Sequence, residues 1–332
     1  PNGQSMEFAL VRVSESPNIF ASKEYQLGER ADSGMDKRQT DTSVSGTVYV
    51  QGKNGAPGYW AIPIARTEVT RAQYAAVMGG EIPKNGAKLP VTSISRLEAY
   101  TFIEKLNSWL YSKGVLDKIG TANLHGKPFL RLPLESEWEF AARGGLEVED
   151  ALFKKGVPYP EEALKSAEVF FSGTTSTSPR NVASGICNPC GLYDMLGNVS
   201  EMVQDAFRPE YHYGRAGSNV NRGGNFLSDV KDITAYYRQE APVFKKDGSA
   251  WKDASLGFRL AIGSPIISSK MSVSKLSEQW DTHLADSSRL VLHPGANTTD
   301  DTKTRLERQN VELGKNLEAM NANLKLLQSA SS

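Results

Sequence analysis

The sequence predicts a mixed α+β domain in which loops make up much of the chain. From residue 6 to about residue 263, short apolar runs are separated by Gly, Pro, Asn and Ser, a pattern typical of short strands joined by turns. Two stretches in this region have the periodicity of helices. Glycine occupies 29 of the 332 positions, and this content favours a loop-rich mixed fold over a helical bundle.

The first predicted helix runs from Ser95 to Lys113. Ser95 can cap its N-terminus, and Glu98 follows three residues later, which is the spacing of a capping box. Apolar residues at helical spacing then form one face, which we expect to pack on the core: Ala99, Phe102, Ile103, Leu106 and Leu110.

The second predicted helix extends from about Leu134 to Arg143, after a proline and before a pair of glycines. Trp138, Ala141 and Ala142 should face the core. Short apolar runs bounded by breakers predict four strands: Met6–Val13, Val48–Gln51, Tyr59–Ile64 and Phe258–Ile262.

A domain boundary is predicted after Gly263, where the chain becomes richer in Ser, Lys, Asp and Asn and poorer in aromatic residues. This divides the chain into a domain of residues 1–263 and an extension of residues 264–332. Within the extension, apolar residues from Leu306 to Leu327 recur at intervals of four and three, which predicts a heptad helix over about residues 300–328 with Asn310 as the polar seam residue. Packing on its own domain, homodimer formation and binding of a helical partner all remain open for this helix.

Charge and hydropathy exclude some partners. Lys and Arg number 38, as do Asp and Glu, so no net charge draws the chain to nucleic acid or anionic lipid. No run approaches the roughly 20 apolar residues that a membrane-spanning helix needs, so an integral membrane protein is not expected. The chain opens with Pro1-Asn2-Gly3, without Met or an apolar signal core, which leaves open a removed leader or a trimmed chain.

The two cysteines, Cys187 and Cys190, form one Cys-x-x-Cys motif. The motif is compatible with a short disulfide, with two reduced packing residues and with a redox pair, and the sequence leaves these open. Zinc is not expected, because the four histidines offer no second ligand pair at a useful spacing.

A glycine turn between Asp194 and Glu201 is the most informative segment. Two carboxylates seven residues apart, with Gly197 between them and backbone carbonyls free to turn inward, can surround a hard cation that takes six or more oxygen ligands. On these residues alone another interpretation stays open, in which Asp194 caps a turn and Glu201 is a surface carboxylate.

Six segments in order carry a resemblance to a known family: Ala65–Thr70 with Gln73 and Tyr74, Leu89–Val91, Arg131–Gly145, Cys190–Glu201, Asn221–Gly224 and Leu256–Ala261. Over about residues 6–263 the sequence resembles the formylglycine-generating enzyme, or sulfatase-modifying factor, family. The resemblance implies a formylglycine-generating-enzyme-like (C-type-lectin-like) α+β fold with little regular secondary structure, followed here by the helical extension.

The resemblance also implies one structural calcium ion at the glycine turn. Its ligands would be the side chains of Asp194 and Glu201 and the backbone carbonyls of Gly197 and Val199. A second calcium site in the family draws on an Asn and an Asp further upstream. The corresponding stretch, Ala167–Thr175, is shortened and lacks the Asp, so we expect that site to be absent or altered.

Catalysis in the family needs two cysteines a few residues beyond the Gly-Gly motif, because paired thiolates bind monovalent copper. In this chain those positions are Ser228 and Ile233, and no cysteine follows Cys190. Ser200 and Met202 also stand where the family usually has tryptophans. We therefore expect a chain without copper and without the family's enzymatic activity.

These observations predict a non-catalytic binding or regulatory protein that uses loops on a rigid scaffold and its C-terminal helix for protein contacts. Within the family the sequence is similar to the TagR type of periplasmic regulator, which acts upstream of a transmembrane Ser/Thr kinase controlling type VI secretion. The similarity implies a periplasmic location after removal of a leader, with membrane association through a partner. That partner would be the periplasmic part of such a kinase or another secretion accessory protein.

Two other functions remain open. One is a copper-independent enzyme of the same fold, as in siderophore maturation, with these candidate polar groups: Ser228, Asp229, Arg238 and Arg259. The other is a ligand-display module that binds through the loops of residues 207–255 and these aromatic residues: Tyr211, Tyr213, Tyr236, Tyr237 and Trp251. Each residue also has a structural interpretation, namely loop anchoring for the arginines, turn chemistry for Ser228 and Asp229, and packing for the aromatic rings.

Overall fold

The computed structural model describes residues 1–16, 18–29, 40–52, 56–118, 127–159, 162, 177–208, 216–266 and 270–291. Contacts within the chain divide it into two compact units, Pro1–Ser277 and Glu278–Ser332, and helix α6 (Lys270–Val291) crosses the division. Among the described residues, no helix is both long and apolar enough to span a bilayer. The heptad helix predicted over residues 300–328 lies outside the described residues.

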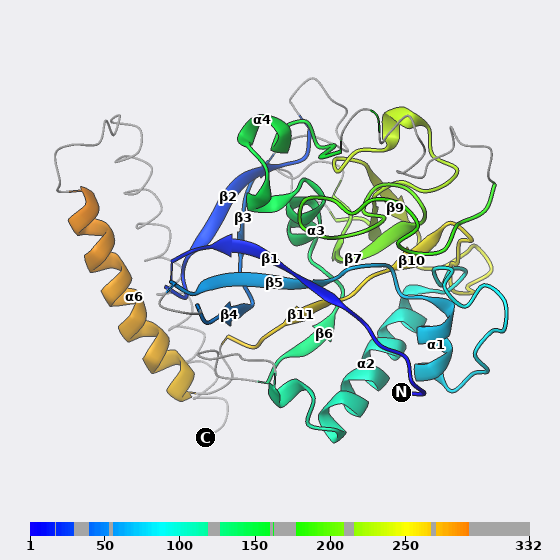
Figure 1. Cartoon of the computed structure of the whole chain (residues 1–332), viewed down its shortest axis with the longest axis horizontal. Helices are drawn as coiled ribbons and strands as arrows, with labels where there is room; N and C mark the ends of the chain where they lie inside the picture. The colour runs from blue at the N-terminus through cyan, green and yellow to red at the C-terminus, as the bar shows by residue number, and fades with distance from the viewer. Residues whose placement is uncertain are drawn as a thin grey trace. The chain divides into compact units, whose positions relative to one another are not determined.

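Strands of the first unit form three sheets among the described residues (Figure 1). The largest has the order β1-β5-β11-β6, with β4 added on β5: β1 (Phe8–Ser14), β4 (Val48–Val50), β5 (Tyr59–Ala65), β6 (Phe129–Arg131) and β11 (Ala261–Gly263). The second has the order β10-β7-β8-β9: β7 (Ser200–Ala206), β8 (Asn219–Arg222), β9 (Arg238–Ala241) and β10 (Leu256–Phe258). The third pairs β2 (Ser22–Leu27) with β3 (Thr40–Ser45). All pairings are antiparallel except β10 with β7.

Apart from α2, the described helices that lie wholly within the first unit are short, and together with the sheets they confirm the predicted α+β class. Their bounds are α1 (Arg71–Met78), α2 (Arg96–Ser112), α3 (Glu135–Ala142) and α4 (Asp150–Phe153), with 3₁₀ turns η1 (Leu116–Lys118), η2 (Gly145–Glu147) and η3 (Val230–Asp232).

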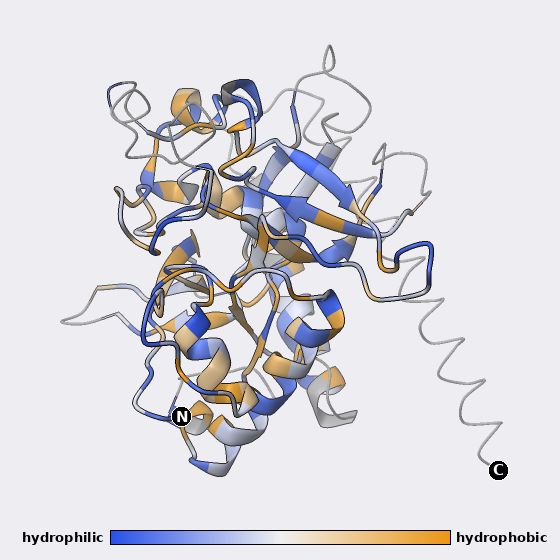
Figure 2. Cartoon of the chain, turned by 90° about the vertical axis from the view of Figure 1, so that its right-hand side faces the viewer, coloured by the Kyte–Doolittle hydropathy of each residue, from blue (hydrophilic) through white to orange (hydrophobic). Residues whose placement is uncertain are grey.

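Helix α2 begins where the capping box predicts. The Ser95 hydroxyl accepts a hydrogen bond from the backbone N–H of Glu98 at 3.2 Å, and Glu98 Oε2 accepts one from the backbone N–H of Ser95 at 2.7 Å. Both bonds satisfy donors that the first helical turn leaves without partners. Helices α1 and α2 each carry hydrophobic and hydrophilic residues along their length (Figure 2), and the apolar face of α2 is buried from Ala99 to Leu106.

The core has two large clusters among the described residues, with strand β5 between them, and a small third cluster of Val199 and Phe226. Ile62 and Ile64 of β5 pack with α3 in one cluster, whereas Ala65 belongs to the cluster built on α2. Six of the seven residues of β5 are buried, as the continuous apolar run of a strand covered on both faces predicts. Both packing layers therefore meet along this strand.

The strand predicted over Phe258–Ile262 is wrong as a single element. The chain leaves the second sheet after Phe258 and joins the first sheet at Ala261, so that β10 and β11 belong to different sheets. At this crossing, Phe258 accepts a backbone hydrogen bond from Val69, and Leu260 accepts one from Ala65. A short apolar run fits one strand or two, because periodicity alone does not reveal which partner each residue has.

Several elements have no counterpart in the sequence-based prediction. Helix α1 has a capping box formed by Thr70 and Gln73, but its eight residues are too few for a clear helical period. Strands β2, β3, β7, β8 and β9 were likewise not predicted, since their sequences are largely polar.

Candidate functional site

Helix α3 places three glutamates in the interior of the first unit. Glu135, Glu137 and Glu139 are at most 4% exposed, on the same short helix as the fully buried Trp138. Buried glutamates need ionic or hydrogen-bonding partners, because transfer of a bare carboxylate from water into a protein interior is very unfavourable. Glu135 and Glu139 find partners in Arg222 and Arg238, which lie more than 80 residues further along the chain, and Glu139 also pairs with Arg143 one helical turn away.

Two glutamates and three arginines form what we call the arginine–carboxylate network: Glu135, Glu139, Arg143, Arg222 and Arg238. Glu135 accepts hydrogen bonds from Arg222 at 2.8 Å and from Arg238 at 2.6 Å and 3.0 Å. Glu139 pairs with Arg143 through one oxygen and with Arg222 through the other. The network therefore ties α3 to β8 and β9.

The Glu139 carboxylate also holds a loop. Its Oε1 accepts the backbone N–H of Gly28 at 2.8 Å, and Arg143 donates to the carbonyl oxygen of Gly28 at 3.0 Å. Glu139 and Arg222 are both fully buried. Removal of one member would leave its partners charged and only partly compensated in a region of low dielectric.

The turn of residues 194–201 lies beside a second buried ion pair. Arg259 donates from Nε to Glu201 Oε2 at 2.6 Å and from Nη2 to Glu201 Oε1 at 2.5 Å. Trp138 Nε1 donates to the same Oε2 at 2.8 Å. Glu201 is 1% exposed, so the interpretation of Glu201 as a surface carboxylate is wrong.

Asp194 and Asn198 shape the turn. Both have positive φ, near 55°, in the left-handed region that Asp and Asn tolerate better than most residues. Asp194 Oδ2 accepts the backbone N–H of Ala183 at 2.7 Å, and Asn198 Nδ2 donates to Glu68 Oε1 at 2.9 Å. Asp194 therefore fastens a neighbouring loop, in addition to any role as a ligand.

Glu68 was not predicted as a site residue, although it occupies the centre of this region. It is 1% exposed, and its buried Oε2 has no hydrogen-bond partner in the part of the chain that the structure describes. Burial, and then the charge of Asp194, raise the pKa of Glu68 well above its usual range, whereas Arg259 opposes the shift. Burial also raises the pKa of Asp194. The only sequence signal was one glutamate among apolar residues and threonines at positions 67–70.

Three buried carboxyl groups, those of Glu68, Asp194 and Glu201, thus gather around the turn, and carboxylate oxygens are the ligands that a hard cation takes. The four predicted ligands, Asp194, Gly197, Val199 and Glu201, all lie on one short segment, and Glu201 Oε1 retains a lone pair beyond its bond to Arg259. No group of three or more His, Cys, Asp or Glu side chains in the described part of the chain is arranged to hold a metal. A calcium ion here would therefore rely on the two backbone carbonyls.

Ser228 and Ile233 lie together against the Gly-Gly motif. A Cβ atom on Gly224 would come within 2.9 Å of Ile233 Cδ1 and 3.2 Å of Ser228 Oγ, and Gly224 has φ +67°. Ile233 is 4% exposed and belongs to the core cluster of α3. The structure therefore brings a hydroxyl and an alkyl group close together at these two positions.

The polar candidates for catalysis have structural partners. Arg238 donates to Glu135 and to the Arg208 carbonyl, and Arg259 donates to Glu201 and to backbone carbonyls. Ser228 Oγ accepts the backbone N–H of Asn225 within a turn, and Asp229 is largely exposed on the next turn. These contacts match the structural interpretation of each residue, and the arginines are enclosed in the interior.

The aromatic candidates are dispersed. Tyr236 is buried and its hydroxyl donates to the carbonyl oxygen of Lys154, while Trp251 packs on the α2 cluster. Tyr211, Tyr213 and the stretch Ala167–Thr175, where the second calcium site was expected to be absent or altered, lie outside the described residues.

Both cysteines are free thiols in the structure. Cys187 is exposed, whereas Cys190 packs against the α3 cluster. Burial raises the pKa of Cys190 to about 12, and the charge of Glu147 adds to the effect. Cys190 is therefore protonated at neutral pH and is a packing residue in this state.

We predict that Glu139→Gln destabilises the fold by about 3–5 kcal/mol, because Arg143 and Arg222 lose a shared buried counter-charge. The measurement is urea-induced unfolding at pH 7. Glu147→Gln is the matched control, since Glu147 pairs with Arg12 at the surface and its loss should cost at most about 1 kcal/mol. Equal decreases in the free energy of unfolding in the two variants would contradict the proposal that the arginine–carboxylate network stabilises the fold.

We predict that one thiol of the reduced, folded protein reacts rapidly with Ellman's reagent at pH 8. Cys187 is exposed, whereas the pKa of Cys190 near 12 leaves almost no reactive thiolate at this pH. Cys187→Ser should abolish the rapid phase, and addition of denaturant should reveal Cys190. Two equally fast thiols would show that Cys190 is not buried in solution.

The chain is similar in sequence to proteins of two kinds, Ser/Thr kinases and formylglycine-generating enzymes. Over 168 residues the chain is 33% identical to the "Serine/threonine-protein kinase pkn1" of Chlamydia pneumoniae, covering 46% of this chain and 23% of the relative. Over 149 residues it is 34% identical to the "Inactive C-alpha-formylglycine-generating enzyme 2" of Bos taurus, covering 40% of this chain and 44% of the relative. The chain thus spans less than half the length of these two relatives.

Among solved structures, the "Treponema denticola variable protein 1" aligns with a TM-score of 0.55 and 22% sequence identity, covering 78% of this chain and 96% of that one. This likeness supports the predicted fold. Residues 58–263, more than half of the chain, match the sulfatase-modifying factor enzyme 1-like domain. The chain therefore belongs to the formylglycine-generating enzyme, or sulfatase-modifying factor, family.

Proposed function

We propose that this chain is a non-catalytic binding and regulatory protein built on a formylglycine-generating-enzyme scaffold. The observation that carries the proposal is the pair Ser228 and Ile233, which lie together against Gly224. Monovalent copper prefers thiolates, and a hydroxyl engaged in a turn with a buried alkyl group does not replace them. The similarity to a relative named as inactive agrees with this proposal.

The regulatory role that we propose is promotion of signalling to a membrane Ser/Thr kinase that controls type VI secretion. The chain would act in the periplasm and bind the periplasmic part of that kinase or another secretion accessory protein. Three chlamydial relatives carry kinase names, which supports a functional connection between this type of domain and Ser/Thr kinases. The resemblance to TagR-type regulators supplies the secretion pathway and the compartment.

Exposed loops offer a surface for such contacts. Phe244 is 63% exposed in a loop that is held by backbone bonds from Trp251 to Val243 and from Lys245 to Ser249. An apolar side chain on a fixed loop binds a partner with little ordering cost. The domain boundary after residue 263 and the use of the C-terminal helix in association are further parts of this proposal.

We predict that the purified chain binds the periplasmic region of the kinase. It should also raise the autophosphorylation of the full-length kinase in reconstituted vesicles. Phe244→Ser should weaken this binding about tenfold or more, as loss of an anchoring aromatic residue does. Leu97→Ser is the control, because Leu97 is 71% exposed on α2. Absence of both binding and stimulation would refute the kinase proposal.

We predict that Ser228→Cys combined with Ile233→Cys creates a site for one copper(I) ion, measured by competition with a chromophoric chelator. Each single variant is the control and should lack this site, and all proteins would carry Cys187→Ser to remove the exposed thiol. The non-catalytic assignment would be overturned if protein without the introduced cysteines bound one copper ion per chain and consumed oxygen with a cysteine peptide.

We also propose one structural calcium ion at the turn, held by the Asp194 and Glu201 side chains and the carbonyls of Gly197 and Val199. Support comes from family membership and from the excess of buried carboxylate around Glu68. A chelator should lower the melting temperature by about 5 °C if the ion is present at a hundred times its dissociation constant.

The calcium-dependent difference in melting temperature should vanish in Asp194→Ala and persist in Asp229→Ala, whose side chain is exposed on a separate loop. A melting temperature that does not change on chelation of the natural-sequence protein would remove the calcium proposal. The difference between the two conditions, rather than the absolute value, is the readout, because Asp194 also fastens Ala183.

A further inference from the structure

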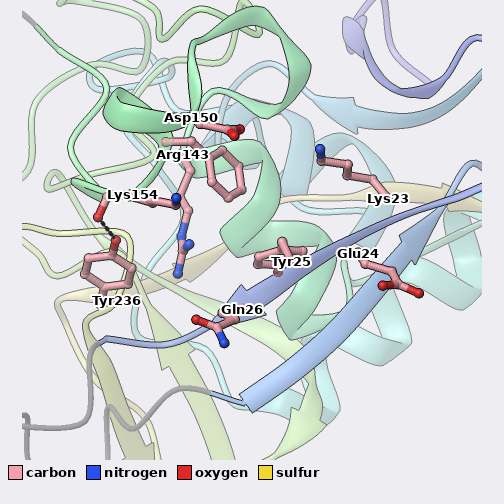
Figure 3. Close-up of a pocket in the computed structure, with 9 residues that line it drawn as sticks. Lys23, Glu24, Tyr25, Gln26, Arg143, Asp150, Lys154 and Tyr236 are labelled. Carbon is pink, nitrogen blue, oxygen red and sulfur yellow. Dashed lines mark hydrogen bonds between the residues drawn. The ribbon is translucent and has the colours of Figure 1, made fainter. Parts of the chain in front are cut away.

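A cavity of about 630 Å³ lies beside Arg143, between strand β2, helix α4 and Tyr236 (Figure 3). Its size is within the range of small-molecule sites in proteins. Its walls carry three cationic side chains, Lys23, Arg143 and Lys154, together with acidic and aromatic ones. None of these residues is among the predicted calcium or copper positions.

Arg143 is held in an unusually defined position in the cavity wall. Its guanidinium lies against three aromatic rings, 4.4 Å from the centroid of Tyr236, 5.0 Å from Phe153 and 5.4 Å from Tyr25. Its hydrogen bonds to described residues, to Gly28 and Glu139, both leave from Nη2. Arg143 is only 2% exposed, and its buried Nε has no hydrogen-bond partner among the described residues.

An arginine in this state has hydrogen-bonding capacity that the protein does not use. Buried guanidinium donors without acceptors are costly, and a planar carboxylate is the group that matches their geometry best. The hydroxyl of Tyr236 already donates to the Lys154 carbonyl, and the hydroxyl of Tyr25 to the Ser136 carbonyl. Both hydroxyl groups therefore have hydrogen-bond partners other than Arg143, which contacts the faces of these rings.

The charges in the cavity wall distinguish between anions. The side chains of Lys23, Lys154 and Asp150 make no ion pair with one another (Figure 3). Glu24 also lines the cavity. A dianion such as phosphate would face the Asp150 carboxylate here, whereas a ligand with one carboxylate and one ammonium group can pair with both signs of charge.

We propose that this cavity binds a free amino acid or a short peptide as a zwitterion. The carboxylate pairs with Arg143 and Lys154, the ammonium group pairs with Asp150, and the aromatic rings contact the nonpolar part. The proposal does not depend on the kinase, calcium or copper assignments.

The test measures binding to the full chain by isothermal titration calorimetry. L-Alanyl-L-alanine should bind, and its N-acetylated and C-amidated forms should each bind at least about fivefold more weakly, which is the effect of losing one exposed charge pair. Free L-alanine in a parallel titration separates the amino-acid source from the peptide source. Sodium sulfate serves as the probe for a simple anion.

Variants locate the site without disturbing buried groups. Lys154→Gln should weaken dipeptide binding about fivefold, and Asp150→Asn should make the free and acetylated dipeptides bind equally. Lys155→Gln and Glu149→Gln are matched controls, because they are exposed neighbours that do not line the cavity. Both should leave binding unchanged.

Three results would overturn the proposal. They are absence of saturable binding for both alanine and the dipeptide, equal affinities in Lys154→Gln and Lys155→Gln, and sulfate binding that competes with the dipeptide while Asp150→Asn has no effect. The last result would identify a general anion site in place of a zwitterion site.

Discussion

The buried carboxylate of Glu139 is the interaction on which the rest of the first unit depends. It pairs with both Arg143 and Arg222 and accepts the backbone N–H of Gly28, so one side chain joins helix α3, strand β8 and the loop after β2. With little regular secondary structure, the fold cannot rely on long ladders of backbone hydrogen bonds. Charge-assisted hydrogen bonds in an interior without water replace these ladders. Loss of one residue of the arginine–carboxylate network weakens the bonds of the residues that remain.

Local signals predicted local structure well. The capping box at Ser95 and Glu98 and the glycine pair after Arg143 correctly marked ends of α2 and α3. Helix α1 was missed because it is short, and the single strand predicted over Phe258–Ile262 was wrong because sheet membership depends on partners nearly 200 residues away, such as Ala65.

The site could be predicted only in part, because many of its contacts join residues that are far apart in the sequence. Asp194 and Glu201 are recognisable because both lie on one turn, and their spacing is visible in the sequence. Their surroundings are not local: Arg259 and Trp138 approach Glu201 from positions 58 and 63 residues away, and Asn198 reaches Glu68 across 130 residues. No spacing rule describes contacts of that kind, so only the structure reveals the surplus of buried acid.

The passage of the chain from β10 to β11 has a consequence for unfolding. The carbonyls of Leu260 and Phe258 accept backbone hydrogen bonds from Ala65 at the end of β5 and from Val69 after it. Arg259, between them, forms the ion pair with Glu201 of β7. Neither sheet can open at this point without releasing the other. Hydrogen exchange in the two sheets should therefore follow a single cooperative opening event, so that the first unit behaves as one foldon although its strands belong to separate sheets.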